Sequence, residues 1–345
     1  MASSDASDGR PLNACLVGHG MTGIWHAQAL REAGCVLHTL VGRRADPTRA
    51  FAEQHGFGRW TTSYEEALAA SEIELVVLAN PSEQHAAFAA LALEYGKHVL
   101  VEIPLALELA SAERLVADAA RRGLQLGVVH PLRARPELIA LRGRIAAGAE
   151  RLQLISGRFL IHRLENVGAS GYARSWTDNL LWHHMAHLVD AGLWVASAPS
   201  TGVESHMPPA DRRTGIPMDA VLLARFGDAA ALSVVGSYGC HERSFELVAV
   251  TDADSYRLDV LAGSLTTSAG TVAIEEEGAN CRRITRDFAA AVAGGTRPSV
   301  SGEDVLPAMR VLGRVQDAWD ARHGRQALPG RPLATTVEDG RHPRG

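Results

Sequence analysis

The chain has 345 residues, of which 46% are hydrophobic and 21% charged, a balance typical of a globular protein with two domains. Its formal net charge of -5 excludes the basic field that a nucleic-acid-binding protein needs, and no apolar run approaches the roughly 18 residues of a membrane span. Of the 34 Lys and Arg residues only Lys97 is a lysine, so any lysine-dependent mechanism has one candidate. Four scattered cysteines without a C-x-x-C pair indicate reduced thiols and a cytoplasmic protein.

The order of apolar segments predicts a first domain at 12–131, after a disordered N-terminus at 1–11. Short apolar runs read as strands at 12–17, 36–41, 75–78, 98–102 and 125–129. Helical stretches separate them at 22–33, 47–55, 83–95 and 111–122. This alternation favours βαβ crossovers and therefore a parallel, doubly wound Rossmann sheet.

The pattern changes after residue 131, and we expect a second, α+β domain at 132–330 followed by a tail at 331–345. Helices are expected at 136–147 and 178–196, and a long strand at 153–162. Alternation with period two indicates a large, mostly antiparallel open sheet from the segments 220–226, 230–237, 244–251, 255–261 and 264–274. Helices at 281–293 and 302–321 follow, and the last is expected to pack back on the first domain. The open face of the sheet predicts a homodimer or homotetramer.

A G-x-G-x-x-G motif follows the first strand and opens a helix: Gly18-His19-Gly20-Met21-Thr22-Gly23. In that context glycines permit a tight turn, and backbone N–H groups at the helix N-terminus approach a pyrophosphate. A glycine-rich turn without a ligand is the alternative. The motif predicts a dinucleotide cofactor.

The end of the second strand indicates which dinucleotide binds. An NAD site has an Asp or Glu there to accept hydrogen bonds from the ribose. This chain has Val41-Gly42-Arg43-Arg44-Ala45, with no acid before Asp46. Because arginine binds phosphate through a planar, permanently charged fork, Arg43 and Arg44 favour NADP, with NAD as the alternative.

Further motifs accompany the glycine loop: His26 after it, Leu78-Ala79-Asn80-Pro81 with His85, 96–104 (GKHVLVEIP), His187-Leu188-Val189-Asp190 and 297–304 (RPSVSGED). In combination they resemble the glucose-fructose oxidoreductase/inositol dehydrogenase/MocA (Gfo/Idh/MocA) family. The resemblance implies a Rossmann domain, an open-sheet domain and nicotinamide-dependent oxidoreduction of cyclic polyols or sugars. It also implies that the cofactor lies beside Asn80, Pro81, His85, Glu102, Ile103 and Pro104.

Two departures from the family pattern point to one of its branches. The family's Glu-Lys-Pro has its catalytic lysine where this chain has Ile103, and its Asp-x-x-x-His pair becomes His183-x-x-x-His187. Together with 174–178 (RSWTD) and 181–184 (LWHH), these departures resemble the 4-carboxy-2-hydroxymuconate-6-semialdehyde dehydrogenases. That branch oxidises a cyclic hemiacetal to 2-pyrone-4,6-dicarboxylate with NADP during the aromatic catabolism of protocatechuate.

Lys97 cannot replace the missing lysine, because six residues of strand place it roughly 20 Å from Ile103, at the wrong edge of the sheet. We therefore expect a histidine base, which is adequate for a hemiacetal hydroxyl because that hydroxyl is more acidic than a plain alcohol. His183 and His187 share a face of the predicted helix. His187 is the expected base, and His183 is expected to orient it or the substrate. Zinc would suit the same spacing, but no third ligand is evident and no metal is expected there.

A carboxylated substrate needs cations and a shaped pocket. The candidate substrate-binding residues are Arg133, Arg174, His130, His162, His184, Trp176 and Trp182. Surface arginines and core aromatic residues remain the alternative for them. Two other functions also remain open: a dehydrogenase of another lactol, sugar or cyclitol, and an NADP-binding regulator without turnover.

Overall fold

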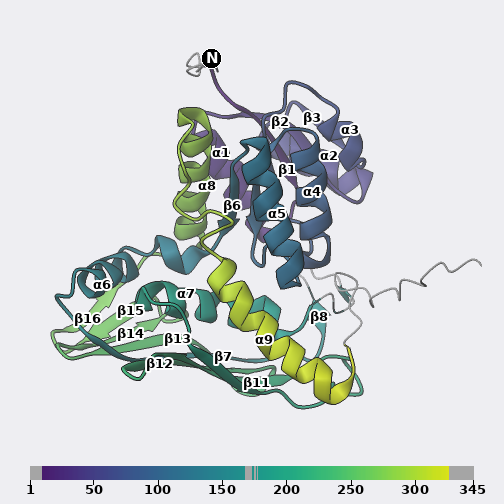
Figure 1. Ribbon diagram of the computed structural model, residues 1–345. Coiled ribbons are helices and arrows are strands. Elements are labelled where there is room, and N and C mark those ends of the chain that lie inside the picture. The colour runs from purple at the N-terminus through teal and green to yellow at the C-terminus, as the bar shows by residue number, and fades with distance from the viewer. Residues whose placement is uncertain (1–9, 168–172, 175, 177, 326–345) are drawn as a thin grey trace, which may run out of the picture.

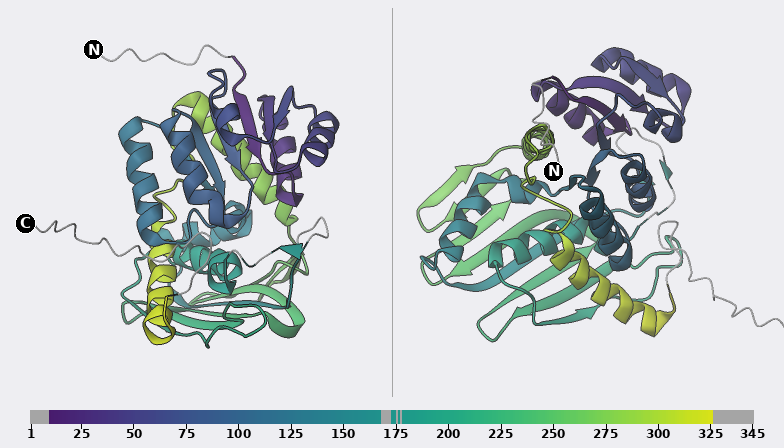
Figure 2. Two further views of the ribbon diagram at one scale, coloured as in Figure 1. Left: turned by 90° about the vertical axis from the view of Figure 1, so that its right-hand side faces the viewer. Right: turned by 45° about the horizontal axis from the view of Figure 1, so that its top comes forward.

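The computed structural model describes residues 10–325 except 168–172, 175 and 177, with only the backbone of 173 and 174. The expected disorder at 1–11, apart from its last two residues, and the expected tail at 331–345 lie outside the described residues. In the described part, a layer of parallel strands and helices stands over one face of a large open sheet, as Figure 1 shows. The turned views in Figure 2 show helices lying between the two sheets.

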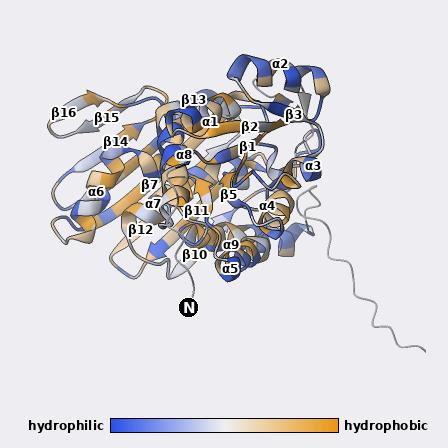
Figure 3. Cartoon of the chain, turned by 90° about the horizontal axis from the view of Figure 1, so that it is seen from above, coloured by the Kyte–Doolittle hydropathy of each residue, from blue (hydrophilic) through white to orange (hydrophobic). Residues whose placement is uncertain are grey.

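Six parallel strands form the first sheet in the order β3-β2-β1-β4-β5-β6. Their bounds are Asn13–Val17 (β1), Val36–Val41 (β2), Arg59–Thr61 (β3), Leu75–Leu78 (β4), His98–Glu102 (β5) and Leu126–Val129 (β6). The central strands are almost continuously apolar because helices cover both faces of the sheet, and Figure 3 shows these strands as hydrophobic beside the hydrophilic α2. Strand order reverses between β1 and β4, the place where such sheets bind ligands.

The helices of this layer connect the strands. They are α1 (Met21–Glu32), α2 (Ala45–His55), α3 (Tyr64–Leu68), η1 (Ser82–Gln84), α4 (His85–Glu94) and α5 (Leu109–Arg122). α2 and α5 each end at a glycine with positive φ, Gly56 and Gly123, which lets the chain turn back toward the next strand. The short elements β3 and α3 are absent from the sequence prediction because three strand residues and five helical residues carry too little periodicity.

Eight strands form the second sheet in the order β10-β11-β12-β7-β13-β14-β15-β16. Their bounds are Leu152–His162 (β7), Gly202–His206 (β10), Asp219–Phe226 (β11), Ala230–Ser237 (β12), Gly239–Thr251 (β13), Ser255–Asp259 (β14), Ser264–Thr267 (β15) and Gly270–Ala273 (β16). Neighbours are antiparallel except β12 and β7, which are parallel. The predicted fold class, a Rossmann sheet followed by a mostly antiparallel open sheet, is confirmed.

One expected strand is wrong in detail. The segment 264–274 forms a hairpin of β15 and β16 rather than one strand, and Gly270, with φ +124°, begins the returning strand. Such a backbone conformation favours glycine. A small additional ribbon pairs β8 (Asn166–Val167) with β9 (Ala173–Arg174).

The remaining helices cover the second sheet or extend the first layer. They are η2 (Pro131–Ala134), α6 (Pro136–Ala146), the π-helical turn Leu181–Met185, α7 (Ala186–Ala196), α8 (Glu277–Gly294) and α9 (Leu306–His323). α7 lies against β7 and β12, α8 packs along α1 and β6, and α9 contacts α7, β10 and α5. No described helix is long and apolar enough to cross a bilayer.

Candidate active site

The glycine loop has the geometry of a pyrophosphate cradle. Gly18 has φ +100°, and a Cβ atom there would lie 2.4 Å from the Ala79 oxygen, so only glycine fits between β1 and β4. A Cβ at Gly23 would lie 2.7 Å from the Gly18 oxygen, which requires glycine for the close approach of α1. Gly20 caps α1 and has nothing within 4 Å of its Cβ position. The loop therefore combines two close approaches with open space at a helix N-terminus, as a dinucleotide needs.

Positive charge gathers at the end of β2. Arg43 and Arg44 are exposed, and both lower the pKa of His19, although burial of that imidazole is the larger cause. Gly42 is required there because a Cβ would lie 2.1 Å from Thr48 Oγ1 and 2.8 Å from the His19 ring. Met21 and Thr22 begin α1 beside this loop.

The first acid after β2 is occupied elsewhere. Asp46 forms an ion pair with Arg49, one turn along α2, at 3.2 Å, and its side chain is 89% exposed. A carboxylate that accepts hydrogen bonds from an adenosine ribose is therefore missing from the turn 41–45 itself. This arrangement is compatible with the charge of a 2′-phosphate.

His85 supports two loops from behind. Its Nδ1 lies 2.7 Å from the Pro104 oxygen and its Nε2 lies 2.9 Å from the Asn80 oxygen, and the side chain is only 1% exposed. It was expected beside the cofactor, but both ring nitrogens are occupied by backbone oxygens. His85 therefore connects the Asn80-Pro81 turn after β4 to the cis Ile103–Pro104 bond after β5. It holds these two turns together.

Glu102 and Lys97 lie at opposite ends of β5. Lys97 is 5% exposed, and its Nζ donates to the oxygens of Ala70 and Ile73 at 2.9 and 2.8 Å, so it ties down loops at the amino edge. At the carboxyl edge, Glu102 Oε1 lies 2.9 Å from His26 Nε2. The expected contact between Glu102 and a cofactor stays a prediction, with this oxygen engaged by His26.

The histidine motif occupies an irregular helix start. The predicted regular helix over 178–196 begins instead with the π-helical turn Leu181–Met185 and continues as α7. Asn179 Oδ1 accepts hydrogen bonds from the backbone N–H groups of Leu181 and Trp182, at 3.1 and 3.3 Å, and so caps this start. Wide π turns occur often at functional sites because they re-aim side chains.

His183 forms a pair with a buried carboxylate. Its Nδ1 lies 2.9 Å from Asp178 Oδ2, and Ser82 Oγ donates to the same oxygen at 2.6 Å. Burial alone would raise the pKa of the Asp178 carboxyl, but the charge of His183 and the hydrogen bonds from His183 and Ser82 hold it below its usual value. The His183 side chain is 40% exposed whereas that of Asp178 is 5% exposed. A buried carboxylate thus orients an accessible imidazole.

His184 points toward the second sheet. Its ring stacks on Phe159 with centroids 4.0 Å apart, and its Nδ1 lies 2.7 Å from the Tyr238 hydroxyl. Burial, followed by the charges of neighbouring His183 and Arg163, lowers the pKa of His184 well below its usual value. His184 is therefore a neutral imidazole at pH 7.

His187 is less suited to accept a proton than its position in the motif suggests. Burial, followed by the nearby His130 and His183, lowers the pKa of His187 to about 3, against a smaller opposing effect of Asp190. Its ring lies edge-on to Phe245, with centroids 6.1 Å apart. An imidazole with so low a pKa holds a proton weakly.

Arg133 and Trp182, both expected to bind substrate, make structural contacts. The Arg133 guanidinium donates to both carboxylate oxygens of Asp190 at 2.7 Å and to the Asp304 oxygen at 2.7 Å, and its side chain is 6% exposed. Trp182 is 1% exposed, and its Nε1 donates to Gln316 on α9 at 3.1 Å. These contacts give both side chains a structural role.

The remaining expected substrate residues lie in different places. His130 is buried, with Nδ1 3.0 Å from Asp190 Oδ2. His162 is exposed at the end of β7 and stacks on His241 with centroids 4.2 Å apart. Trp176 is half-buried and stacks on Tyr238 at 5.5 Å. Arg174 lies in β9, but its side chain is outside the described residues.

Sequence reasoning missed four residues around His183 and His184: Ser82, Arg163, Asp178 and Tyr238. Arg163 lies 5.3 Å from the Trp176 ring and 5.6 Å from the Tyr238 ring, and it donates to Asn166 at 2.6 Å. Asp178 is the exception that a signal could have found, because it ends the quoted RSWTD motif. The other three are isolated residues that only the fold brings together.

Comparisons with known proteins agree with this fold. The family model for Gfo/Idh/MocA, described as an oxidoreductase family with an NAD-binding Rossmann fold, matches residues 12–130, and the model for the C-terminal domain of bacterial oxidoreductases matches 136–245. The 4-carboxy-2-hydroxymuconate-6-semialdehyde dehydrogenase of Sphingobium sp. (strain SYK-6) is 29% identical over 311 residues, which cover 88% of this chain and 98% of that protein.

More distant relatives support the same assignment. The 1,5-anhydro-D-fructose reductase of Ensifer adhaerens is 33% identical over 124 residues, 36% of this chain and 37% of that protein. A levoglucosan dehydrogenase solved with NADH and levoglucosan superposes with a TM-score of 0.79 at 18% identity, over 90% of this chain and 97% of that one, and shows the shared fold. The chain therefore belongs to the Gfo/Idh/MocA family and is a nicotinamide-dependent oxidoreductase that acts on a CH–OH group.

Proposed function

We propose that this chain is an NADP-dependent dehydrogenase that oxidises the cyclic hemiacetal of 4-carboxy-2-hydroxymuconate-6-semialdehyde to 2-pyrone-4,6-dicarboxylate, a step of aromatic catabolism. The observation that carries the proposal is the oriented imidazole of His183, held by buried Asp178 in a family member that has Ile103 where a lysine is usual. The similarity to the Sphingobium enzyme over nearly the whole chain supports the substrate.

His183 is the better candidate for the base, with the roles expected for His183 and His187 exchanged. Because Asp178 accepts from Nδ1–H, Nε2 of His183 keeps its lone pair and can take the hydroxyl proton. Loss of this proton together with a hydride from the carbon that bears the hydroxyl would convert the hemiacetal to a lactone. The depressed pKa of His187 suits a neutral residue that shapes the pocket.

Residues of the glycine loop would hold the cofactor. Gly18, Gly20 and Gly23 leave the backbone free to bind the pyrophosphate, and exposed Arg43 and Arg44 would bind a 2′-phosphate. When bound, the nicotinamide ring supplies the hydride acceptor. A KM for NAD well below that for NADP would contradict this cofactor preference.

A substrate carboxylate would bind Arg163. This guanidinium lies against the faces of Trp176 and Tyr238, which hold its planar fork in place, and it is close enough to His184 to lower the pKa of that imidazole. Arg163 would have the substrate-binding role that was expected for Arg133, whose guanidinium is paired with Asp190. Arg163→Gln should raise KM for a carboxylated hemiacetal but not for an uncharged lactol.

A substrate screen tests the function against its alternatives. NADPH formation with the carboxylated hemiacetal, beside uncharged lactols, sugars and inositols, should be fastest with the carboxylated compound. Preference for a sugar or a cyclitol would favour the alternative function, a dehydrogenase of another lactol, sugar or cyclitol. Tight NADP binding without turnover on any of these compounds would favour a regulator.

We also propose that two or more copies associate through the outer face of the second sheet. Leu154, Val221 and Val235 point outward there and are 41%, 46% and 38% exposed, and Val221 pairs with Val235 across adjacent strands. Exposed apolar side chains on an open sheet face favour a partner surface. Light scattering should give a dimer or tetramer, and Val235→Glu should reduce it to a monomer. A monomeric native protein would contradict this assembly.

A further inference from the structure

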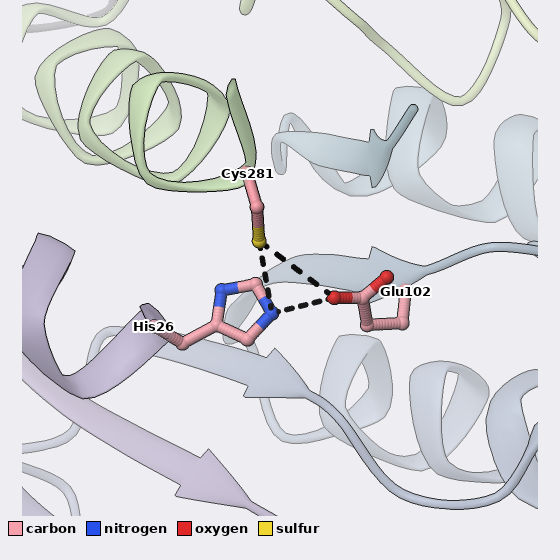
Figure 4. Close-up of side chains that lie close together, drawn as sticks. All are labelled: His26, Glu102 and Cys281. Atoms are coloured by element: carbon pink, nitrogen blue, oxygen red, sulfur yellow. Dashed lines mark hydrogen bonds and ion pairs between the residues drawn. The ribbon is translucent and has the colours of Figure 1, made fainter. Parts of the chain in front are cut away.

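Three side chains with metal-binding atoms meet between the first sheet and α8. Figure 4 shows His26 from α1, Glu102 from the end of β5 and Cys281 from α8 pointing toward one another. His26 Nε2 lies 2.9 Å from Glu102 Oε1, and Cys281 Sγ lies 4.0 Å from that nitrogen and 3.9 Å from that oxygen. The side chain of His26 is 0% exposed and that of Glu102 14% exposed, and Cys281 is 1% exposed.

Both ring nitrogens of His26 have a polar neighbour. Thr285 Oγ1 donates to the Cys281 oxygen at 3.0 Å, so its single proton is used. With its proton on that oxygen, Thr285 Oγ1 would accept a hydrogen bond from His26 Nδ1, which lies 2.9 Å away. In a neutral imidazole Nε2 then carries a lone pair, and this lone pair faces the Glu102 carboxylate at 2.9 Å. Two acceptors at this distance share either a proton or a metal cation.

The cluster is close to the size of a tetrahedral metal site. Zinc binds nitrogen and oxygen at about 2.0–2.2 Å and sulfur at about 2.3 Å, which places the ligand atoms of one ion about 3.3–3.6 Å apart. The separation of 2.9 Å between His26 and Glu102 is shorter than these values, and the separations of 3.9 and 4.0 Å to Cys281 are longer, so the three side chains would adjust when an ion binds. A thiolate and a carboxylate also neutralise a divalent cation, so the buried site would carry no net charge. The hydrogen bond from Nδ1 to Thr285 is the outer contact that orients a histidine ligand.

We propose that His26, Glu102 and Cys281 bind a zinc-class divalent cation, with water in the fourth position. When the metal binds, the Cys281 thiol releases its proton to solvent and the sulfur becomes a ligand. The ion joins α8, which follows the second sheet in the chain, to α1 and β5 of the first layer. Its role is structural, because its ligands come from three elements far apart in the sequence, and the site is separate from His183 and His187, where zinc was weighed on sequence grounds.

Cobalt binding to the full-length protein tests the site. The purified protein is stripped with a chelator and titrated with Co²⁺, whose bond to a thiolate gives a charge-transfer absorption band, and zinc content is measured after reconstitution with Zn²⁺. We expect one zinc per chain, a cobalt band that saturates at one equivalent, and a higher Tm with Zn²⁺. Cys281→Ala should abolish the band and the Tm increase.

Two further variants keep the test decisive. Cys240→Ala changes a half-buried thiol on β13 and should behave as the native protein does. Glu102→Gln keeps the size of the side chain and, if Cys281→Ala fails to fold, should still weaken cobalt binding at least tenfold. A band that survives Cys281→Ala, or a stripped native protein that takes up no zinc and shows no Tm change, would overturn the proposal and leave only a proton between His26 and Glu102.

Discussion

Asp178→Asn is the most informative single substitution for the proposed chemistry. The carboxylate receives hydrogen bonds from His183 at 2.9 Å and Ser82 at 2.6 Å on the same oxygen, and it is buried. An amide of the same shape has one acceptor oxygen and an NH2 group. If the NH2 group faces His183, the imidazole proton moves to Nε2, which then cannot act as a base.

The size of the effect follows from the charge that Asp178 supplies. When His183 takes the substrate proton it becomes a cation, with its charge centre about 5 Å from the carboxylate. At an effective dielectric constant near 20 this attraction is worth about 3 kcal/mol. Since each ~1.4 kcal/mol changes a rate tenfold, kcat should fall by about 10²-fold. Because the His183 side chain is 40% exposed, solvent screens the attraction and keeps the loss near this value.

Initial rates of NADPH formation measure this loss of kcat. Fluorescence titrations with NADP and unfolding in urea are the controls. The Kd for NADP and the fold should change little, because Asp178 does not touch the glycine loop. Ser82→Ala removes one hydrogen bond to the same oxygen and leaves the imidazole tautomer intact, so its loss should stay below about tenfold. An Asp178→Asn enzyme with kcat within threefold of native would refute the role of the pair.

Three further predictions concern the cofactor, the fold and acid stability. Replacing Arg43 and Arg44 together by alanine should raise KM for NADP at least tenfold and leave KM for NAD nearly unchanged; equal effects on both would contradict a 2′-phosphate site. Arg133→Ala leaves the Asp190 carboxylate buried without its partner and should lower the free energy of unfolding by about 3–5 kcal/mol in urea titrations, whereas a loss below 1 kcal/mol would contradict the buried pair. The folded-state pKa of His187, about 3, lies below its ordinary value, so the unfolded chain binds the extra proton, and stability should fall from about pH 6.5 toward pH 3 by up to ~1.4 kcal/mol per pH unit. His187→Gln should flatten this decline, and an unchanged slope would count against the low pKa.

The fold could be predicted because its signals are local. A few residues are enough to predict a strand such as β4, which has four buried apolar residues in a row. The same holds for β11 and β12, in which apolar residues alternate with period two. Short elements such as β3 could not be found in this way. The turn that divides 264–274 depends on one glycine, Gly270, whose conformation is visible only in the structure.

The site was less predictable because partners far apart in the chain decide each residue's role. The glycine loop carries its own geometry, so Gly18, Gly20 and Gly23 could be read directly. The sequence predicts that Arg133 is a cation of the substrate pocket. In the structure its guanidinium pairs with Asp190, which is 57 positions away in the chain. No rule of sequence spacing predicts the contact between Ser82 and Asp178. The sequence around His183 predicts a regular helix, so the π turn found there could not be predicted.

The central claim, hemiacetal oxidation with NADP through His183, is tested most directly by one comparison of rates. The native enzyme and His183→Gln are given NADP and the carboxylated hemiacetal, and NADPH and 2-pyrone-4,6-dicarboxylate are measured together. The account predicts equal amounts of the two products from the native enzyme and a loss of kcat of ~10²-fold or more in the variant, with NADP binding intact. Native activity in the variant, or a native enzyme that oxidises inositol or glucose but not the hemiacetal, would contradict it.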